Sequence, residues 1–497
     1  MLYILAVGCC VLLLAKVVLS RLRAPLPPGP KGTLWHGNLH QLPWVEPWKV
    51  FTEWTKSYGP LIYLHAYGRN ILIVHGFGPA ADLMDKRALL YARRPKWSMA
   101  ALTGRSQNIA FMDHNERQRK ARALMQSALN PRAQREWGPV LEAETTKLIQ
   151  NLVISPEDYK RHVKWYLASF INRFTFGFEI DDAHQKMADE LSAHTQQALR
   201  PGRWVVDIVP ALIYLPEWLP GMGFKRWASE AKAKFNSFVD VPFQAIKRSV
   251  MSGSDDRCMV ANMLREIMQG ESKFDEPALI SAASSIYTAA TDTTAAILLN
   301  FLLLITTHPE VQQKAYAEIR EIVGSDRLPH LADQASLPYI NAVMKEVHRF
   351  NPVTPMIPRS PVQDDNYNDY RIPQDTWVMF NIWSIAHDST LYADPDVFRP
   401  ERHFASSKAE PEMDPREFTF GFGKRICPGS ALANAQIYLV ISTILSVFEV
   451  RPPLNDEGRE EMPPIAYTST FVSFPKPFSC RFVPRNNGLA QQLALMI

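Results

Sequence analysis

One cysteine near the carboxyl end lies in a loop whose composition suits a thiolate that binds a metal. Cys427 belongs to the decapeptide Phe420–Gly429, and Arg425 stands two residues before it. The glycines of this loop let the backbone turn tightly, and backbone N–H groups aimed at the sulfur stabilise its charge. The apolar run over 431–448 predicts a helix whose N-terminus favours the thiolate further. Phe420 can shield the sulfur from water, and Arg425 can bind an anionic group.

The decapeptide has two interpretations. A lone cysteine is more commonly a buried structural residue, since free cysteine is among the most buried residue types. The whole pattern, however, is F-x-x-G-x-R-x-C-x-G, and it resembles the cysteine-ligand loop of the cytochrome P450 family of haem-thiolate monooxygenases at every signature position. The resemblance implies that Cys427 is the axial ligand of haem b and that Arg425 pairs with a haem propionate. The remaining loop residues in contact with the cofactor would be Phe420, Gly421 and Gly429.

An acid and an alcohol are adjacent in the middle of an apolar stretch. Asp292 and Thr293 belong to the segment Ala289–Thr294, which resembles the family's oxygen-activation motif, A/G-G-x-D/E-T-T/S, with Ala290 in the usual glycine position. Reductive cleavage of dioxygen consumes two protons, so the resemblance implies Thr293 as the hydrogen-bonding alcohol and Asp292 as the proton relay. Alternatively, a helical threonine merely bonds back to its own backbone. Ala289 and Ala290 are candidate pocket residues.

A long helix must position this pair. Asp275 and Pro277 predict its start, because an acid at the cap and a proline in the first turn are both favoured there. From Ala278 to about Thr307 the chain is apolar and long enough to span a membrane, but a carboxylate at its centre would be costly in lipid. We therefore expect a helix that is buried through the protein core.

Charged residues from two segments predict a support for the cysteine loop. Glu346 and Arg349 form an E-x-x-R pair on one helix face, and isolated pairs of this kind are usually weak. The segment 398–404 resembles the family's P-E-R-F element and contains Arg402, with His403 inserted before the aromatic residue. The resemblance implies a buried ionic triad of Glu346, Arg349 and Arg402 beside the loop.

The same resemblance implies further haem and pocket residues. The basic helix expected over 115–129 aligns with the family's W-x-x-x-R helix, with Gln118 in the tryptophan position and Arg122 as a propionate partner. Its charges also fit a solvated face or a surface for an acidic redox partner. Arg359 resembles the basic residue that pairs with a propionate, and a turn-rich connector is the alternative for its segment. The candidate pocket residues before it are Val353, Thr354, Met356 and Ile357.

The N-terminus predicts a membrane anchor. Residues 1–20 are almost wholly apolar and basic residues follow them, so we expect a single transmembrane helix with the catalytic domain in the cytosol. A cleaved signal peptide is the alternative, but no positive segment precedes the apolar run. Residues 21–34 read as a basic, proline-rich hinge and residues 35–497 as the haem-thiolate domain. The resemblance to microsomal members implies the endoplasmic reticulum membrane.

Composition narrows the function classes. The net charge of +4 is too small to indicate nucleic acid binding, and no basic block is interleaved with aromatic residues. Five cysteines without paired spacing argue against a disulfide scaffold or a zinc site. Short β-rich runs over 61–74 predict a hairpin, whereas most other segments are helical. We expect a mainly α fold with a small β-rich lobe, which the resemblance identifies as the P450 fold.

Three segments between the motifs carry weaker predictions. Residues 79–90 are expected to form a helix, and residues 93–108 form either a pocket loop or a plain surface loop. The segment 204–224 is apolar and punctuated by prolines, which favours a membrane or ligand surface, with a buried loop as the alternative.

The resemblance as a whole implies a monooxygenase that inserts one oxygen atom of O2 into a C–H or C=C bond of a hydrophobic molecule, with electrons from NADPH through a reductase. The segments 352–359 and 418–429 are most similar to fungal secondary-metabolism enzymes. Two alternatives are an O2-independent haem-thiolate isomerase or dehydratase and a non-enzymatic membrane haem sensor, in which Asp292 and Thr293 would be idle. Terpenoid, polyketide, indole and fatty-acid substrates all stay open.

Overall fold

The computed structural model describes residues 24–200, 202–405 and 410–485, so the predicted membrane helix over 1–20 lies outside the described residues. The described chain is mainly helical with three small sheets, which confirms the expected fold class. The helices are α2 (Pro47–Tyr58), α3 (Phe77–Ala81), α4 (Ser98–Leu102), α5 (Glu116–Ala128), α6 (Pro131–Ile154), α7 (Tyr159–Phe176), α8 (Asp182–Ala198), α9 (Val205–Ile208), α10 (Phe224–Met251), α11 (Met259–Met268), α12 (Glu276–Thr307), α13 (Pro309–Ile322), α14 (Pro338–Phe350), α15 (Ile382–Ala386), α16 (Arg416–Thr419) and α17 (Ser430–Val447). The strands are β1 (Leu61–Ala66), β2 (Arg69–Val74), β3 (Met356–Arg359), β4 (Asp365–Tyr367), β5 (Tyr370–Ile372), β6 (Trp377–Asn381), β7 (Phe448–Arg451) and β8 (Arg481–Pro484).

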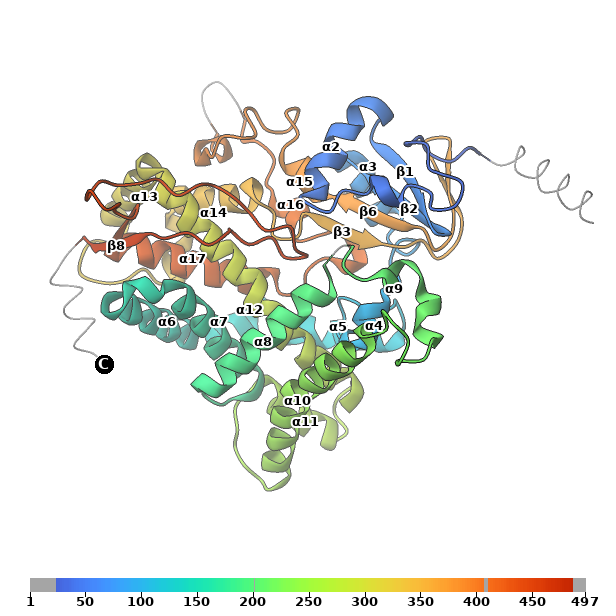
Figure 1. Ribbon diagram of the computed structural model, residues 1–497. Helices are drawn as coiled ribbons and strands as arrows, with labels where there is room; N and C mark the ends of the chain where they lie inside the picture. Colours follow the sequence, from blue (N-terminus) through green and yellow to red (C-terminus); the bar gives the residue numbers. More distant parts are fainter. Residues whose placement is uncertain (1–23, 201, 406–409, 486–497) are drawn as a thin grey trace, which may run out of the picture.

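The β-rich lobe is built on a four-stranded sheet with the order β1-β2-β6-β3. β1 and β2 form the predicted hairpin, with Leu61 opposite Val74 in antiparallel register. β6 pairs parallel with β2, where Ile71 faces Trp377, and antiparallel with β3. The sheet lies in the upper right of Figure 1 and joins the N-terminal hairpin to the strand that ends at Arg359.

α12 runs through the helical part of the molecule (Figure 1). Asp275 caps it, because its Oδ1 accepts the N–H of Ala278 at 2.9 Å, and Pro277 stands in the first turn as predicted. α12 packs against α5, α7 and α17. Among the described residues, α12 and α17 are each long and apolar enough to span a membrane, but 67% of each apolar window is buried inside the protein. The expectation of a buried core helix is therefore confirmed.

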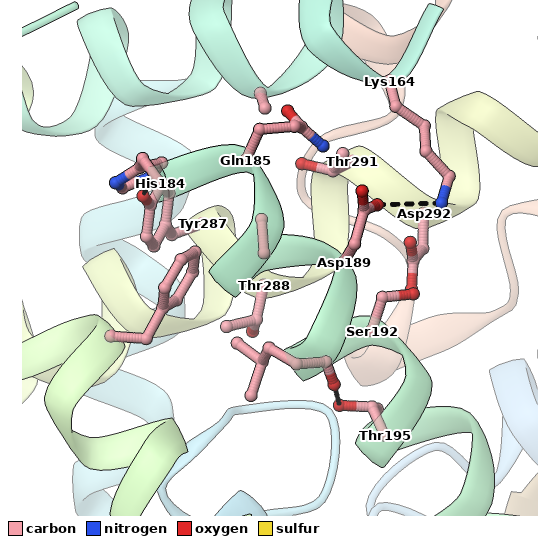
Figure 2. A pocket seen from close by; sticks show the side chains of 14 residues that line it. Lys164, His184, Gln185, Asp189, Ser192, Thr195, Tyr287, Thr288, Thr291 and Asp292 are labelled. Atoms are coloured by element: carbon pink, nitrogen blue, oxygen red, sulfur yellow. Dashed lines mark hydrogen bonds and ion pairs between the residues drawn. The ribbon is translucent and has the colours of Figure 1, made fainter. Parts of the chain in front are cut away.

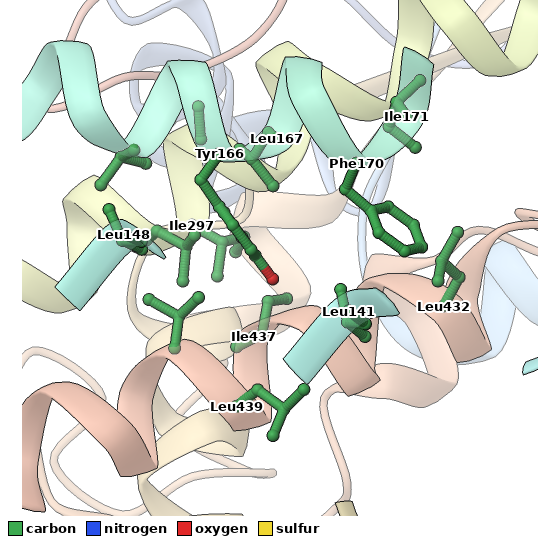
Figure 3. Packing of buried hydrophobic residues seen from close by; sticks show 14 of the residues in the cluster. Leu141, Leu148, Tyr166, Leu167, Phe170, Ile171, Ile297, Leu432, Ile437 and Leu439 are labelled. Atoms are coloured by element: carbon green, nitrogen blue, oxygen red, sulfur yellow. The ribbon is translucent and has the colours of Figure 1, made fainter. Parts of the chain in front are cut away.

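The main hydrophobic core fixes α12 relative to its neighbours (Figure 3). Leu148 of α6, Tyr166 of α7, Ile297 of α12 and Ile437 of α17 are all buried in one cluster. Burying an aliphatic or aromatic side chain of this size stabilises the fold by about 1.5–3 kcal/mol. Because the acid–alcohol pair lies on α12 and the cysteine loop leads into α17, this packing holds the two predicted motifs in place relative to each other.

A smaller hydrophobic cluster joins α4, α9 and α10. Met99 of α4, Val206 of α9 and Ala228 of α10 are its buried members. In the segment predicted to be a membrane or ligand surface, Tyr214 and Trp218 are 88% and 81% exposed. The segment thus buries one part of its apolar surface and presents the other part to the outside.

The helix predicted over 79–90 is only partly correct. α3 ends at Ala81, a π-helix follows over Asp82–Lys86, and the chain then turns. The wide π-helical turn brings the Met84 carbonyl against Gly423 of the cysteine loop, where an added Cβ would collide with it. A contact between residues so distant in the sequence overrides the local helical pattern.

Candidate active site

The cysteine loop is closed by its own backbone. The Cys427 N–H donates to the Phe420 carbonyl at 2.8 Å. Gly421 and Gly423 have φ angles of 79° and 54°, in the left-handed region that favours glycine. At Gly423 a side chain is also excluded by the carbonyl of Met84. The glycine positions of the motif are therefore requirements of the loop's shape.

The Cys427 side chain is accessible although the surrounding chain encloses it on most sides. Burial raises the pKa of the thiol, while the Gly429 N–H and the charge of Arg122 lower it. α17 begins at Ser430, directly after the loop, so its N-terminal dipole also favours negative charge near the sulfur. The sulfur can therefore reach a ligand, and a metal cation would stabilise its thiolate form.

Arg425 anchors the loop to a much earlier part of the chain. Its Nε donates to the Ala92 carbonyl at 2.7 Å, and its Nη1 and Nη2 donate to Ile109 and Met112, each at 2.9 Å. A guanidinium carries five N–H donors, so these bonds leave two for another acceptor. Arg425 can thus hold the loop and still bind an anion.

Three more arginines surround the loop. Arg122 of α5 donates to the Ile426 carbonyl at 2.6 Å, and Arg94 and Arg359 both donate to the carbonyl of Pro358. Burial, together with the charges of neighbouring arginines, lowers the pKa of Arg359 to about 9 and that of Arg94 well below its ordinary value. Among the described residues, neither Arg94 nor Arg359 has an ion-pair partner.

This arginine cluster fits the two propionates of a haem. The neighbouring charges that act on Arg94 and Arg359 are all positive. An uncompensated buried cation is costly, and arginine binds carboxylates in bidentate geometry. In such a site Cys427 would bind the haem iron, and the predicted residues Arg122, Arg359 and Arg425 would hold the carboxylates.

Two further residues near the cluster have buried N–H donors without a hydrogen-bond partner among the described residues. Arg94, which the motifs do not predict, has a buried Nε without a hydrogen-bond partner among the described residues. Its only sequence signal is the pair Arg93-Arg94 at the start of the candidate pocket loop. Gln118, in the tryptophan position of the basic helix, is buried and its Nε2 is likewise unpartnered in the part of the chain described. Both could donate to the same anionic ligand.

The acid and the alcohol of α12 contact different neighbours. Thr293 Oγ1 donates to the Ala289 carbonyl at 2.9 Å, one turn earlier on the same helix. Asp292 Oδ2 instead accepts from Ser192 Oγ of α8 at 2.6 Å. Burial raises the pKa of Asp292, and the Ser192 hydrogen bond opposes that rise. The Asp292 carboxyl therefore faces α8 (Figure 2), whereas the Thr293 hydroxyl is hydrogen-bonded to the backbone of α12.

The candidate pocket residues lie on α12 and on the segment that leads into β3. Ala289 is exposed in the middle of a mostly buried helix, which indicates open space beside it. Ile357 is buried, and a Cβ added at Gly421 would lie 3.7 Å from its Cδ1, so β3 adjoins the cysteine loop. The half-buried members of the set are Ala290, Val353, Thr354 and Met356.

Glu346, Arg349 and Arg402 form a buried ionic network. Glu346 Oε1 lies 2.8 Å from Arg349 Nη2 and 3.1 Å from Arg402 Nε, and all three side chains are 0% exposed. His403 Nε2 lies 3.1 Å from the other Glu346 oxygen, so the residue that departs from the motif joins the network. Burial pushes the pKa of Glu346 upward, but the bond to His403 and the two arginine charges outweigh it and lower this pKa to about 2.

The two arginines extend the network to the backbone. Arg349 Nη1 donates to the carbonyls of Ala386 and Pro395 at 2.9 and 2.7 Å, and Arg402 Nη1 donates to that of Ala393 at 2.6 Å. These bonds tie α14 and α15 to the irregular segment that precedes the cysteine loop. The network thus fixes the chain segments that lead into the cysteine loop.

Comparison with known proteins agrees with this geometry. A family model described as Cytochrome P450 matches residues 27–482. Cytochrome P450 monooxygenase 136 of Postia placenta is 34% identical, over 99% of this chain and 94% of its own length. Cytochrome P450 monooxygenase claR of Ampulloclitocybe clavipes is 35% identical over 95% and 89%, and cytochrome P450 monooxygenase COX1 of Coprinopsis cinerea is 32% identical over 97% and 95%.

A mainly helical fold with an accessible cysteine, an arginine cluster and a central acid–alcohol pair defines a haem-thiolate class of oxidoreductase. The chain belongs to the cytochrome P450 family and is a monooxygenase similar to those of fungi. Members of this family bind haem through a cysteine thiolate and receive electrons from a redox partner.

Proposed function

We propose that the protein is a membrane-anchored monooxygenase of the endoplasmic reticulum that inserts one oxygen atom from O2 into a hydrophobic small molecule. The product would be a hydroxylated or epoxidised compound, and the second oxygen atom would leave as water. NADPH would supply two electrons through a partner reductase. The similarity to fungal monooxygenases, together with the resemblance of segments 352–359 and 418–429, supports a role in secondary-metabolite biosynthesis.

The observation that carries this proposal is the environment of Cys427. Its sulfur is accessible, receives the Gly429 N–H and lies near the positive charge of Arg122. A structural cysteine needs neither the accessibility nor the surrounding cations, whereas an axial thiolate beside two propionates needs both. In the part of the chain that the structure describes, Arg94 and Arg359 have no ion-pair partner, which suits a site for an anionic cofactor.

Each predicted residue then has a task in the reaction. The haem, when bound, supplies the activation of dioxygen. Cys427 and the arginines hold and orient the cofactor, and the core helices exclude bulk water. Asp292, whose pKa is raised by burial, can hold a proton at neutral pH more readily than an exposed aspartate, and Thr293 can hydrogen-bond to the oxygen side of the site.

Exposed apolar residues support membrane association. Trp35 follows the predicted hinge, and Trp218 belongs to the segment after α9; each is 81% exposed. The two regions adjoin, because a Cβ added at Gly202 would collide with the ring of Trp44, and both lie at the right of Figure 1. Aromatic side chains of this kind favour the interface between membrane and water.

The two alternatives make different demands on the site. An O2-independent isomerase or dehydratase would need the cysteine loop but neither a reductase nor the Asp292–Thr293 pair. A non-enzymatic haem sensor is disfavoured because the relatives are named as monooxygenases. Turnover that proceeds without NADPH would favour the first alternative over the proposed function.

The test is the absorption spectrum of the reduced holoenzyme with carbon monoxide. We expect the red-shifted Soret band of a haem thiolate in the wild type and its complete loss in Cys427→Ser, together with loss of NADPH-dependent turnover. Cys258→Ser is the matched control, because Cys258 is buried at the N-cap of α11, where serine is also favoured. A wild type without the band, or a Cys427→Ser variant that keeps it, would refute the ligand assignment.

A further inference from the structure

A buried histidine lies beside the cysteine loop. His348 belongs to α14, between Glu346 and Arg349 of the ionic network, and only 4% of it is exposed. α14 packs against α16 and α17, and these are the two helices between which the cysteine loop runs. Neither the ionic network nor the arginine cluster uses this histidine, so its burial at this place has another cause.

The ring of His348 contacts the start of the loop. Its centroid lies 5.2 Å from that of the Phe420 ring, and the two planes meet at 55°. Rings at this separation attract each other through packing and through their charge distributions. The Phe420 carbonyl accepts the Cys427 N–H at 2.8 Å. A side chain that holds Phe420 in place therefore also holds the residue that closes the loop around the cysteine.

The same ring faces a residue just beyond the other end of the loop. Burial, with the charge of Arg416, lowers the pKa of His348 to about 4, and a hydrogen bond with Asn434 of α17 opposes that shift. His348 Nε2 and Asn434 Oδ1 are both buried, and neither has another hydrogen-bond partner among the described residues. A neutral imidazole can donate one N–H to an amide oxygen, so the two groups satisfy each other.

We propose that His348 is a positioning residue for the thiolate ligand. It holds both sides of the cysteine loop, Phe420 by ring contact and Asn434 by a hydrogen bond, and it thereby keeps water from the sulfur and sets the reduction potential of the haem iron. The inference rests on the proposed function, because Cys427 must be the ligand of that iron.

The potential of a thiolate-bound iron depends on the groups around the sulfur. Second-shell hydrogen bonds and exclusion of water both tune it. The Gly429 N–H acts on the Cys427 sulfur, and Gly429 directly precedes α17, so movement of either end of the loop alters this environment. The ferrous state carries one more negative charge than the ferric state. Water that enters beside the sulfur would therefore stabilise the ferrous state and raise the potential.

The test separates the two contacts of His348. His348→Leu removes both the ring contact and the hydrogen bond, His348→Phe keeps a ring against Phe420, and Asn434→Ala removes only the hydrogen bond. His75→Leu is the matched control, because His75 is also 4% exposed with an unpartnered buried Nε2 in the described chain, but its ring faces Asn381. The midpoint potential of each purified holoenzyme is measured by spectroelectrochemical titration. The loss of the red-shifted carbon monoxide band is timed in dilute urea.

We expect His348→Leu to shift the ferric–ferrous equilibrium about 10-fold toward the ferrous form, which is about 59 mV for one electron. The red-shifted band should disappear about 10-fold faster. His348→Phe and Asn434→Ala should each give about a 3-fold change, and His75→Leu should match the wild type.

The inference is overturned if the two His348 variants and Asn434→Ala all keep the wild-type potential, or if His75→Leu shifts it as far as His348→Leu does. If His348→Leu does not retain haem, His348→Phe and Asn434→Ala decide by the same criterion. A wild type without the red-shifted band instead defeats the proposed function itself.

Discussion

The molecule buries two carboxylates in contrasting surroundings. Glu346, behind the cysteine loop, contacts Arg349, Arg402 and His403 and has a pKa lowered to about 2. Asp292, on the central helix, accepts a hydrogen bond from one serine, faces a small polar cavity and has a raised pKa. Both groups are shielded from bulk water, yet their pKa values move in opposite directions because only one of them has a full set of cationic partners.

This difference in pKa indicates that Glu346 has a structural role and that Asp292 can take part in proton transfer. A carboxylate saturated with arginines stays ionised at every physiological pH, so Glu346 can hold backbone segments together but cannot carry a proton. A carboxyl with a raised pKa beside water can change its protonation state, as proton transfer demands. Substitution of each acid by its amide should therefore damage stability in one region and turnover in the other.

The largest effect is expected from Glu346→Gln. Removing the shared anion leaves the buried guanidinium of Arg349 without its ion-pair partner, whereas Arg402 keeps Glu412 at 2.6 Å. The change should lower the free energy of unfolding by about 3–5 kcal/mol. Urea unfolding followed by circular dichroism and haem absorbance checks this expectation. Glu401→Gln is the control, because Glu401 lies on the same segment as Arg402 but pairs with Lys314 at a partly exposed site, where the change should be below about 1 kcal/mol. Equal losses in the two variants would contradict the role given to the network.

The second effect is on turnover. Asp292→Asn keeps the shape of the side chain but cannot carry the proton, so NADPH-dependent oxygen reduction should fall about 100-fold. The free energy of unfolding should change by less than about 1 kcal/mol, because no ion pair is broken. Stopped-flow kinetics and the urea midpoint measure the two quantities on one sample. If Asp292→Asn lowered the free energy of unfolding as much as Glu346→Gln does, the structural role of Glu346 and the proton-transfer role of Asp292 could not be told apart.

The smallest effect is a difference in pH dependence. The folded pKa of Glu346 is depressed, so its contribution to stability is complete above its unfolded value of about 4.5 and is lost as the pH falls toward about 2. The folded pKa of Asp292 is raised above 3.8, so its ionisation lowers stability as the pH rises through that value. Urea midpoints measured across pH should thus show a smaller acid loss in Glu346→Gln and a flatter profile at higher pH in Asp292→Asn. Parallel profiles in all three proteins would contradict these assignments.

The sequence predicts those parts of the molecule that depend on local signals. The cap Asp275, the first-turn Pro277 and the uninterrupted apolar run predict α12 almost residue for residue, and alternation predicts the β1–β2 hairpin. The ionic network is implied by the resemblance of two segments, around Glu346–Arg349 and around Arg402, to motifs of the family. These features have short-range patterns, which is why they can be recognised without a structure.

The remaining features depend on contacts that no local pattern encodes. The π-helical turn places the Met84 carbonyl against Gly423, far along the chain, where only a residue without a side chain leaves room for it. Arg94, His348 and Ser192 become relevant only when separate segments meet around an anionic site, the cysteine loop or a cavity. His403, which interrupts the P-E-R-F motif, is a partner of Glu346. Tertiary packing thus decides which of many ordinary polar residues take part in the site.

The three carbonyls that hold Arg425 precede it by 333, 316 and 313 residues. A chain emerging from the ribosome therefore cannot complete the cysteine loop until almost the whole protein has been synthesised, even though the acceptor carbonyls are made early. Contacts between residues this far apart in the sequence form late and slowly, because closing such a long loop lowers the conformational entropy of the chain before the contact stabilises it. Until Arg425 has been synthesised, the carbonyls of Ala92, Ile109 and Met112 can form hydrogen bonds only with water or with other hydrogen-bond donors of the early chain.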